Sequence, residues 1–156
     1  MLVMLENKLK TALFAIKHGM PIEEVSINID WKDFEGLVAE ILESKNFKVM
    51  RNFRMKKPTM EIDVVGVRLG TALLIDCKHW KRMSRSMLDT IVQKQLERVN
   101  HYVVKTRDII AVPVIVTLYQ EETSFINRVP IVPILQFSSF IDEFYGNLEE
   151  IRTIEK

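Results

Sequence analysis

The chain has 156 residues, 47% apolar and 28% charged, which fits one globular domain and excludes a disordered or fibrous chain. Its single cysteine, Cys77, excludes an internal disulfide framework and a zinc site built from several cysteines. No apolar run approaches the roughly 20 residues of a membrane helix, and charges interrupt the first apolar stretch, unlike in a secretory signal. We therefore expect a soluble, cytoplasmic protein.

The net charge of +1 conceals a segregation of charge along the chain. Residues 1–40 carry −3, residues 41–110 carry +8 and residues 111–156 carry −4. A basic block between two acidic ends is a modest indicator of a polyanionic partner. An ordinary solvated surface explains the same pattern about equally well.

The first half of the chain predicts two helices. Leu2, Leu5, Leu9, Leu13 and Ile16 follow helical spacing, which predicts an amphipathic arm over residues 1–20 that packs on its own domain or on a partner. We expect residues 21–156 to form a single domain. Its first helix begins after Asp30, a suitable N-cap, and its periodic apolar stripe runs through WKDFEGLVAEILESK. Glu35 falls on the rim of that stripe, so it is the helix acid best placed to face the sheet.

Strand-like runs then alternate with helices. Residues 47–53 predict a strand with Phe47, Val49 and Phe53 on one face, and residues 60–67 and 71–78 predict a hairpin. A helix is expected over 86–105, then a buried strand over 109–117. The prolines of 129–135 indicate an edge or irregular strand, and Ser139 can cap a last helix over 140–151. This order predicts an α/β domain with a mixed central β-sheet flanked by helices.

Two carboxylates interrupt the predicted hairpin strands, where an unpaired charge is costly to bury. They are Asp63 in EIDVVG and Asp76 in LLIDCK, and Lys78 follows Asp76 on the same face of its strand, with Cys77 facing the core. If the strands pair, two acids and an ammonium group converge at one end of the sheet. Oxygen ligands suit Mg²⁺ or Mn²⁺, and such an ion beside a lysine favours phosphodiester hydrolysis.

A helical glutamate followed by D-x(12)-D-x-K across two strands resembles the PD-(D/E)xK nuclease superfamily, over about residues 31–145. WKDFEGLVAEILESKNFKV, EIDVVG and IDCKHW are similar to Mrr-type restriction endonucleases and archaeal Holliday-junction resolvases. The resemblance implies a three-layer, restriction-endonuclease-like core. It also implies that Asp63, Asp76 and the Cys77 carbonyl bind the metal and that Lys78 is the catalytic lysine. Glu35 would be a further acid, acting on the metal directly or through water.

Two positions depart from the family pattern. Asp76 stands where glutamate is more frequent, and Ile62 stands where proline often precedes the first aspartate. The resemblance implies a metal-dependent DNA endonuclease that acts as a homodimer. One alternative is a non-catalytic nucleic-acid-binding or interaction subunit that keeps the fold, against which the presence of all three motif residues argues. Another is a structural ion pair between Asp76 and Lys78, which leaves Asp63 unexplained.

Cations gather on both sides of this motif in the sequence. We expect contacts with DNA phosphates from two groups that flank the site, comprising Arg51, Arg54, Lys56, Lys57, Lys81, Arg82 and Arg85. Any one of them is equally well explained as a solvated surface charge. Gln93 and Gln95, on the following helix, are predicted to be exposed polar residues.

Overall fold

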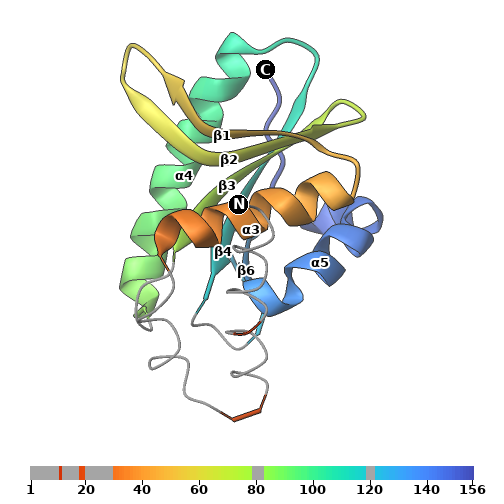
Figure 1. The fold of residues 1–156 in the computed structure, drawn as a ribbon. Helices are drawn as coiled ribbons and strands as arrows, with labels where there is room; N and C mark the ends of the chain where they lie inside the picture. The colour runs from red at the N-terminus through yellow and green to blue at the C-terminus, as the bar shows by residue number, and fades with distance from the viewer. Residues whose placement is uncertain (1–10, 12–17, 20–29, 79–82, 119–121) are drawn as a thin grey trace.

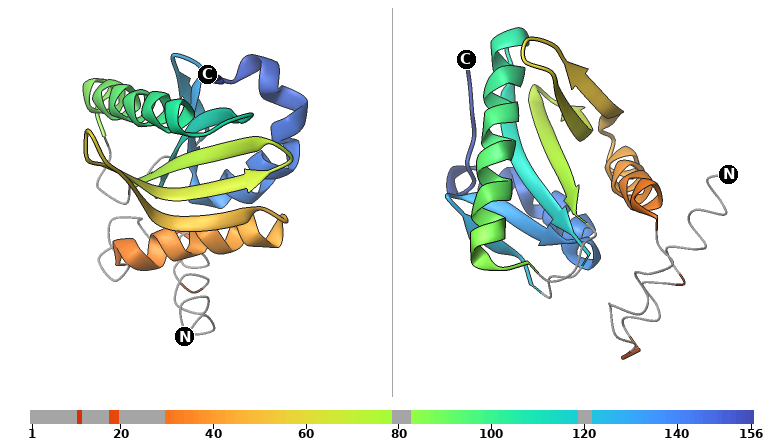
Figure 2. Two further views of the ribbon diagram at one scale, coloured as in Figure 1. Left: turned by 90° about the horizontal axis from the view of Figure 1, so that it is seen from above. Right: turned by 90° about the vertical axis from the view of Figure 1, so that its left-hand side faces the viewer.

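A computed structural model describes residues 11, 18–19, 30–78, 83–118 and 122–156. Helices α3 (Trp31–Ser44) and α5 (Ile134–Glu143) cover one face of a six-stranded sheet, and α4 (Arg85–Lys105) covers the other (Figures 1 and 2). The predicted three-layer α/β architecture is therefore confirmed. The predicted arm over residues 1–20 lies almost wholly outside the described residues. Among the residues described, none of the helices combines the length and the apolar character that crossing a membrane requires.

The sheet is mixed, as predicted. Its strands are β1 (Lys48–Met55), β2 (Met60–Arg68), β3 (Thr71–Lys78), β4 (Ile110–Thr117), β5 (Ser124–Ile126) and β6 (Val129–Pro133), in the order β1-β2-β3-β4-β6-β5. The first three strands pair antiparallel, and β3, β4 and β6 pair parallel. Helix α4 is the crossover that joins β3 to β4, which a parallel pair requires.

Helix α3 begins and packs as its sequence predicts. The Asp30 side chain accepts a hydrogen bond from the Lys32 N–H, and Phe34, Val38 and Leu42 are buried against the sheet. Gly66 on β2 permits this close approach, because a Cβ there would lie 2.9 Å from Leu42 Cδ1. The helix is therefore held directly over β2, the strand that carries Asp63.

The alternation of side chains inverts in the middle of β1 and β2. Phe47 and Val49 pack with α3, whereas Phe53 packs on the α4 side, edge-on to Tyr102 at 5.7 Å between ring centroids. The prediction that these three share a face is therefore wrong. Asn52 lies between them with φ 53°, a left-handed conformation that asparagine tolerates and that rotates the rest of the strand.

Strand β2 shows the same inversion beside Asn52. Ile62 faces α4 while Val64 faces α3, although their positions differ by two. Asp63, which lies between them, would be the partner of Asn52 in the β1–β2 register. The inversion therefore centres on the Asn52–Asp63 position. Because the side chains of β2 change faces at Asp63, its own side chain does not have to point to either face of the sheet.

The C-terminal part differs from the prediction in three respects. Strand β6 is interior, because β5, which sequence reasoning missed, pairs with its outer edge. The ladder with β4 runs only from Ile131 to Pro133, so Pro130 precedes it and Pro133 is its last residue, and neither proline interrupts it. The last helix starts at Ile134, directly after Pro133, not after Ser139, and continues as a 3-10 helix over Phe144–Glu150.

Candidate active site

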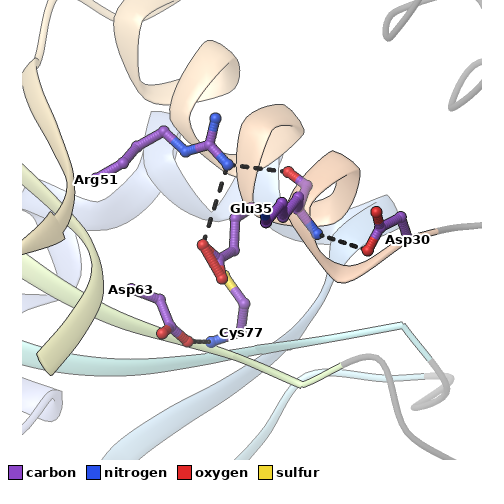
Figure 3. Close-up of polar contacts among 6 residues, drawn as sticks. Asp30, Glu35, Arg51, Asp63 and Cys77 are labelled. Carbon is purple, nitrogen blue, oxygen red and sulfur yellow. Dashed lines mark hydrogen bonds and ion pairs between the residues drawn. The ribbon is translucent and has the colours of Figure 1, made fainter.

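Asp63 lies where β2 and β3 separate. Within the described strands, their ladder ends at the pair Val64–Ile75, one step before Asp63 would face Asp76. In a continued ladder the Cys77 N–H would point toward Ile62. Instead, the Asp63 carboxylate accepts this N–H at 2.9 Å (Figure 3). The carboxylate therefore replaces the main chain of β2 as the hydrogen-bond partner of β3.

The same separation exposes the main-chain carbonyl of Cys77. The carbonyls of Gly70 and Lys78 accept hydrogen bonds from Ile110 and Leu118, so even-numbered residues of β3 direct their main-chain groups toward β4. Cys77 therefore directs both its N–H and its C=O toward β2, because the two groups of one residue share a side of the strand. Its carbonyl oxygen faces the same space as Asp63. Its side chain packs with the α3 core, as predicted.

Asp76 and Lys78 share the other face of β3, as the alternation predicts. Asp76 is 5% exposed, and Lys78 Nζ lies 3.4 Å from its Oδ2. This Oδ2 atom is buried and has no hydrogen-bond partner in the described structure. A buried, incompletely satisfied carboxylate oxygen is costly, which is typical of a ligand for a cation.

Glu35 reaches the site from α3, as its position on the helix rim predicts. It is 2% exposed, it lies beside Asp63 and Cys77 in Figure 3, and Arg51 Nη2 lies 4.0 Å from its Oε1. Burial and, secondarily, the Asp63 charge raise the pKa of Glu35 to about 7. Burial and the nearby Asp76 raise the pKa of Asp63 to about 6, although the Cys77 hydrogen bond opposes the shift. The carboxyl groups therefore repel one another.

These residues line one cleft of about 720 Å³. Its carboxylates are Glu35, Glu61, Asp63, Asp76 and Glu97, and its cations are Lys78, Lys94 and Arg98. The cleft is bounded by α3, by the ends of β2 and β3 and by the middle of α4. It thus brings together all four side chains that the sequence assigned to catalysis.

Sequence reasoning missed the contribution of α4. Gln95, predicted to be exposed, is fully buried, whereas Gln93 is exposed as predicted. The Gln95 amide donates to the Leu74 carbonyl at 2.8 Å and accepts from Arg98 Nη1 at 3.0 Å. The signal that could have identified it is its place beside the apolar stripe of α4, because a buried glutamine must have partners.

The predicted phosphate-binding cations are distributed unevenly. Arg51 donates to the Lys32 carbonyl at 2.9 Å, and Arg54 and Arg85 form exposed ion pairs with Glu61 and Asp89. Lys56 and Lys57 are exposed in the β1–β2 turn, whereas Lys81 and Arg82 lie outside the described residues. Arg51 contacts Lys32 and Glu35 of α3, and Arg54 pairs with Glu61 of β2, so both arginines are tied to elements that border the cleft.

The donor set of the cleft fits a hard divalent cation. Asp63, Asp76 and the Cys77 carbonyl supply oxygen atoms, and Asp76 Oδ2 and Glu35 Oε1 are buried without hydrogen-bond partners among the described residues. In the described part of the chain, no three His, Cys, Asp or Glu side chains are grouped to enclose a metal by themselves. Mg²⁺ is commonly held by one or two carboxylates with water and substrate phosphate, which this arrangement can accommodate.

Comparison with known proteins gives a family match over the region of this site. The family model of the Mrr catalytic domain, described as a restriction endonuclease, matches residues 27–117. An uncharacterized protein of Archaeoglobus fulgidus is 31% identical over 124 residues, which cover 77% of this chain and 95% of the relative.

Two solved structures are also similar. One is a protein of unknown function, AF1548, with a TM-score of 0.38 and 22% identity over 55% of this chain and 46% of its own. This chain therefore spans less than half of that protein. The other is the small subunit of the heterodimeric restriction endonuclease R.BspD6I, with a TM-score of 0.47 and 17% identity over 84% of this chain and 78% of its own.

Proposed function

The chain belongs to the restriction endonuclease family whose model it matches, and we propose that it is a divalent-metal-dependent endonuclease that hydrolyses DNA phosphodiester bonds. The observation that carries this proposal is the convergence of Asp63, Asp76 and Lys78 at the point where β2 and β3 separate. A structural ion pair between Asp76 and Lys78 would not require the Asp63 carboxylate to replace the β2 main chain there.

Asp63, Asp76 and the Cys77 carbonyl would hold Mg²⁺ or Mn²⁺. A bound ion of this kind lowers the pKa of a coordinated water and stabilises charge on the phosphoryl oxygens. Its positive charge would also oppose the burial and the Asp76 charge that together raise the pKa of Asp63. Glu35, which is buried on α3 beside Asp63, would be a further acid that acts on the ion directly or through water.

Lys78 would interact with the reacting phosphate. Its Nζ lies 3.4 Å from Asp76 Oδ2, so the carboxylate holds the ammonium group at the edge of the metal position. From there it can orient the attacking water or neutralise the charge that develops on the phosphate. Loss of this group should lower the rate of cleavage more than the affinity for DNA, because its interaction strengthens in the transition state.

The substrate and the assembly are part of the same proposal. We infer a duplex or a branched junction as substrate, in keeping with the Mrr-type and resolvase resemblance, and a homodimer that supplies two sites for two strands. The competing function is a non-catalytic nucleic-acid-binding or interaction subunit that keeps the nuclease fold, against which the presence of Asp63, Asp76 and Lys78 in one cleft argues.

Cleavage of labelled DNA tests the proposal. Purified full-length chain is incubated with single-stranded, duplex and junction DNA in the presence of Mg²⁺, Mn²⁺ or chelator. We expect metal-dependent cleavage that Asp63→Ala and Asp76→Ala abolish and that Lys78→Ala largely removes. Asp142→Ala, an exposed carboxylate on α5, is the matched control and should cleave like the wild type. Binding of DNA without cleavage under all conditions would favour the non-catalytic subunit.

A further inference from the structure

One face of α4 carries a row of basic residues that begins in the cleft. Lys94, Arg98, His101 and Lys105 recur at intervals of four, three and four residues, which places them within about 60° of one another around the helix. Lys94 and Arg98 line the cleft. The row extends for roughly 16 Å, from the middle of α4 to its last residue.

The row meets further cations at its far end. Lys105 Nζ donates a hydrogen bond to the Lys56 carbonyl in the β1–β2 turn, which lies beside the C-terminal part of α4 (Figure 2). Lys56 and Lys57 are exposed in this turn. Together the four α4 residues and these two lysines form what we name the α4 track. With His101 neutral, the track carries five positive charges.

Five carboxylates line the cleft end of the track, whereas Asp108 follows Lys105 by three residues at the far end. Glu97 borders the row on α4, and Glu61 faces the cleft but forms an ion pair with Arg54 at 3.2 Å. The charge thus divides into an acidic centre, where a metal would bind, and a basic strip that leads away from it. A polyanion anchored at the centre would be attracted along the strip.

Arg98 is held in position before any partner binds. The fully buried Gln95 accepts a hydrogen bond from Arg98 Nη1 at 3.0 Å while it donates to the Leu74 carbonyl of β3. Leu74 lies two residues before Asp76 on the same strand, so the guanidinium group is tied to the framework that carries the acids. A guanidinium group of fixed orientation is suited to bind phosphate oxygens.

We propose that the α4 track binds the DNA backbone on one side of the cleavage site, from Arg98 at the cleft to Lys56 and Lys57 at the turn. This proposal rests on the proposed function and specifies where the substrate runs. The length of the row corresponds to four to five base-pair steps of B-DNA, measured along the duplex axis at about 3.4 Å per step. The strand therefore leaves the cleft along α4 toward the β1–β2 turn.

The test measures how DNA binding depends on salt, in chelator so that no cleavage occurs. Full-length wild type, the double variant Lys94→Ala/Lys105→Ala and the control Lys45→Ala/Arg152→Ala are titrated with a fluorescent duplex at several KCl concentrations. The control removes the same charge from surfaces outside the track. We expect the track variant to lower the slope of log affinity against log salt by about 2 and the control to leave it unchanged.

The outcomes separate this proposal from the nuclease proposal. Arg98→Lys should weaken binding at every salt concentration while it keeps the slope, because the charge remains but the fixed fork is lost. Equal slopes for the track and control variants would contradict the proposal that the α4 track binds DNA. They would not affect the nuclease proposal, which the cleavage assay tests. No binding by the wild type would also overturn the track. A reduced slope in a protein that never cleaves DNA would support the track and count against the nuclease.

Discussion

Replacing Asp63 by asparagine should stabilise the metal-free protein at alkaline pH. Burial and Asp76 raise the pKa of this carboxyl from 3.8 to about 6, so the folded state disfavours its ionised form. A shift of this size corresponds to about 3 kcal/mol, which we reduce to about 2 kcal/mol because Asp63 is only half-buried. The uncharged amide oxygen would bind the Cys77 N–H less strongly, at a cost of about 1 kcal/mol. The net gain is about 1 kcal/mol.

The sign of the effect depends on pH. An acid whose pKa is raised by folding contributes stability below its unfolded pKa, and this contribution is lost as pH rises through the folded pKa. The unfolding free energy of the wild type should therefore fall between pH values of about 4 and 7, through Asp63 and through Glu35, whose pKa is raised to about 7. The variant loses the Asp63 contribution and keeps only the part of the Glu35 contribution that burial causes, so its pH dependence should be shallower.

Urea unfolding followed by circular dichroism, in chelator at acidic and alkaline pH, measures the stability gain of the variant and the pH dependence of both proteins. Asp142→Asn, at a 58% exposed carboxylate, is the matched control and should change stability by no more than about 0.5 kcal/mol. Added Mn²⁺ should make the wild type the more stable of the two proteins. At a hundred times its Kd it stabilises the wild type by about 2.7 kcal/mol, whereas it stabilises the variant little. An Asp63→Asn protein with wild-type stability and pH dependence in chelator would refute the account of a repulsive acid cluster.

Four further variants test the lysine, the backbone inversion and the assembly. Lys78→Ala should bind DNA and Mn²⁺ like the wild type but lose most cleavage, and comparable single-turnover rates would contradict its role. Asn52→Val should cost about 1–2 kcal/mol of stability at φ 53° and weaken Mn²⁺ binding by calorimetry, whereas Asn52→Gly should preserve both. Light scattering should report a homodimer for the full chain, and a version that starts at Pro21 shows whether residues 1–20 form the interface. A monomeric full chain at micromolar concentration would exclude the dimer.

The periodic parts of the chain are the parts that sequence predicted well. Helix α3 follows its apolar stripe, and Asp76 and Lys78 share a face because β3 alternates without interruption. Glu35 faces the site because the helical wheel places it at the rim of the buried stripe. In each case a local repeat determines the direction of the side chain, and the repeat is visible in the sequence.

The less predictable parts depend on contacts between distant segments. Gln95 is polar and reads as a surface residue, but the Leu74 carbonyl and Arg98 satisfy its amide inside the protein. Strand β5 has three residues, which is too few for a periodic signal. It forms because it pairs with the outer edge of β6. The start of α5 was misplaced because Pro133 begins the helix without a side-chain cap, and Ser139 offered a stronger but unused signal.

The inversion at Asn52 and Asp63 explains why a nuclease motif on two strands need not form a regular ladder. If β2 alternated throughout, Asp63 would point toward one face of the sheet and the Ile62 carbonyl would pair with the Cys77 N–H. The left-handed Asn52 and the early end of the β2–β3 ladder instead turn the carboxylate sideways, into the gap that the strand has left. The Cys77 carbonyl faces that gap for the same reason. One irregularity in the backbone thus supplies two of the three oxygen ligands that we propose, and it carries no periodic signature in the sequence.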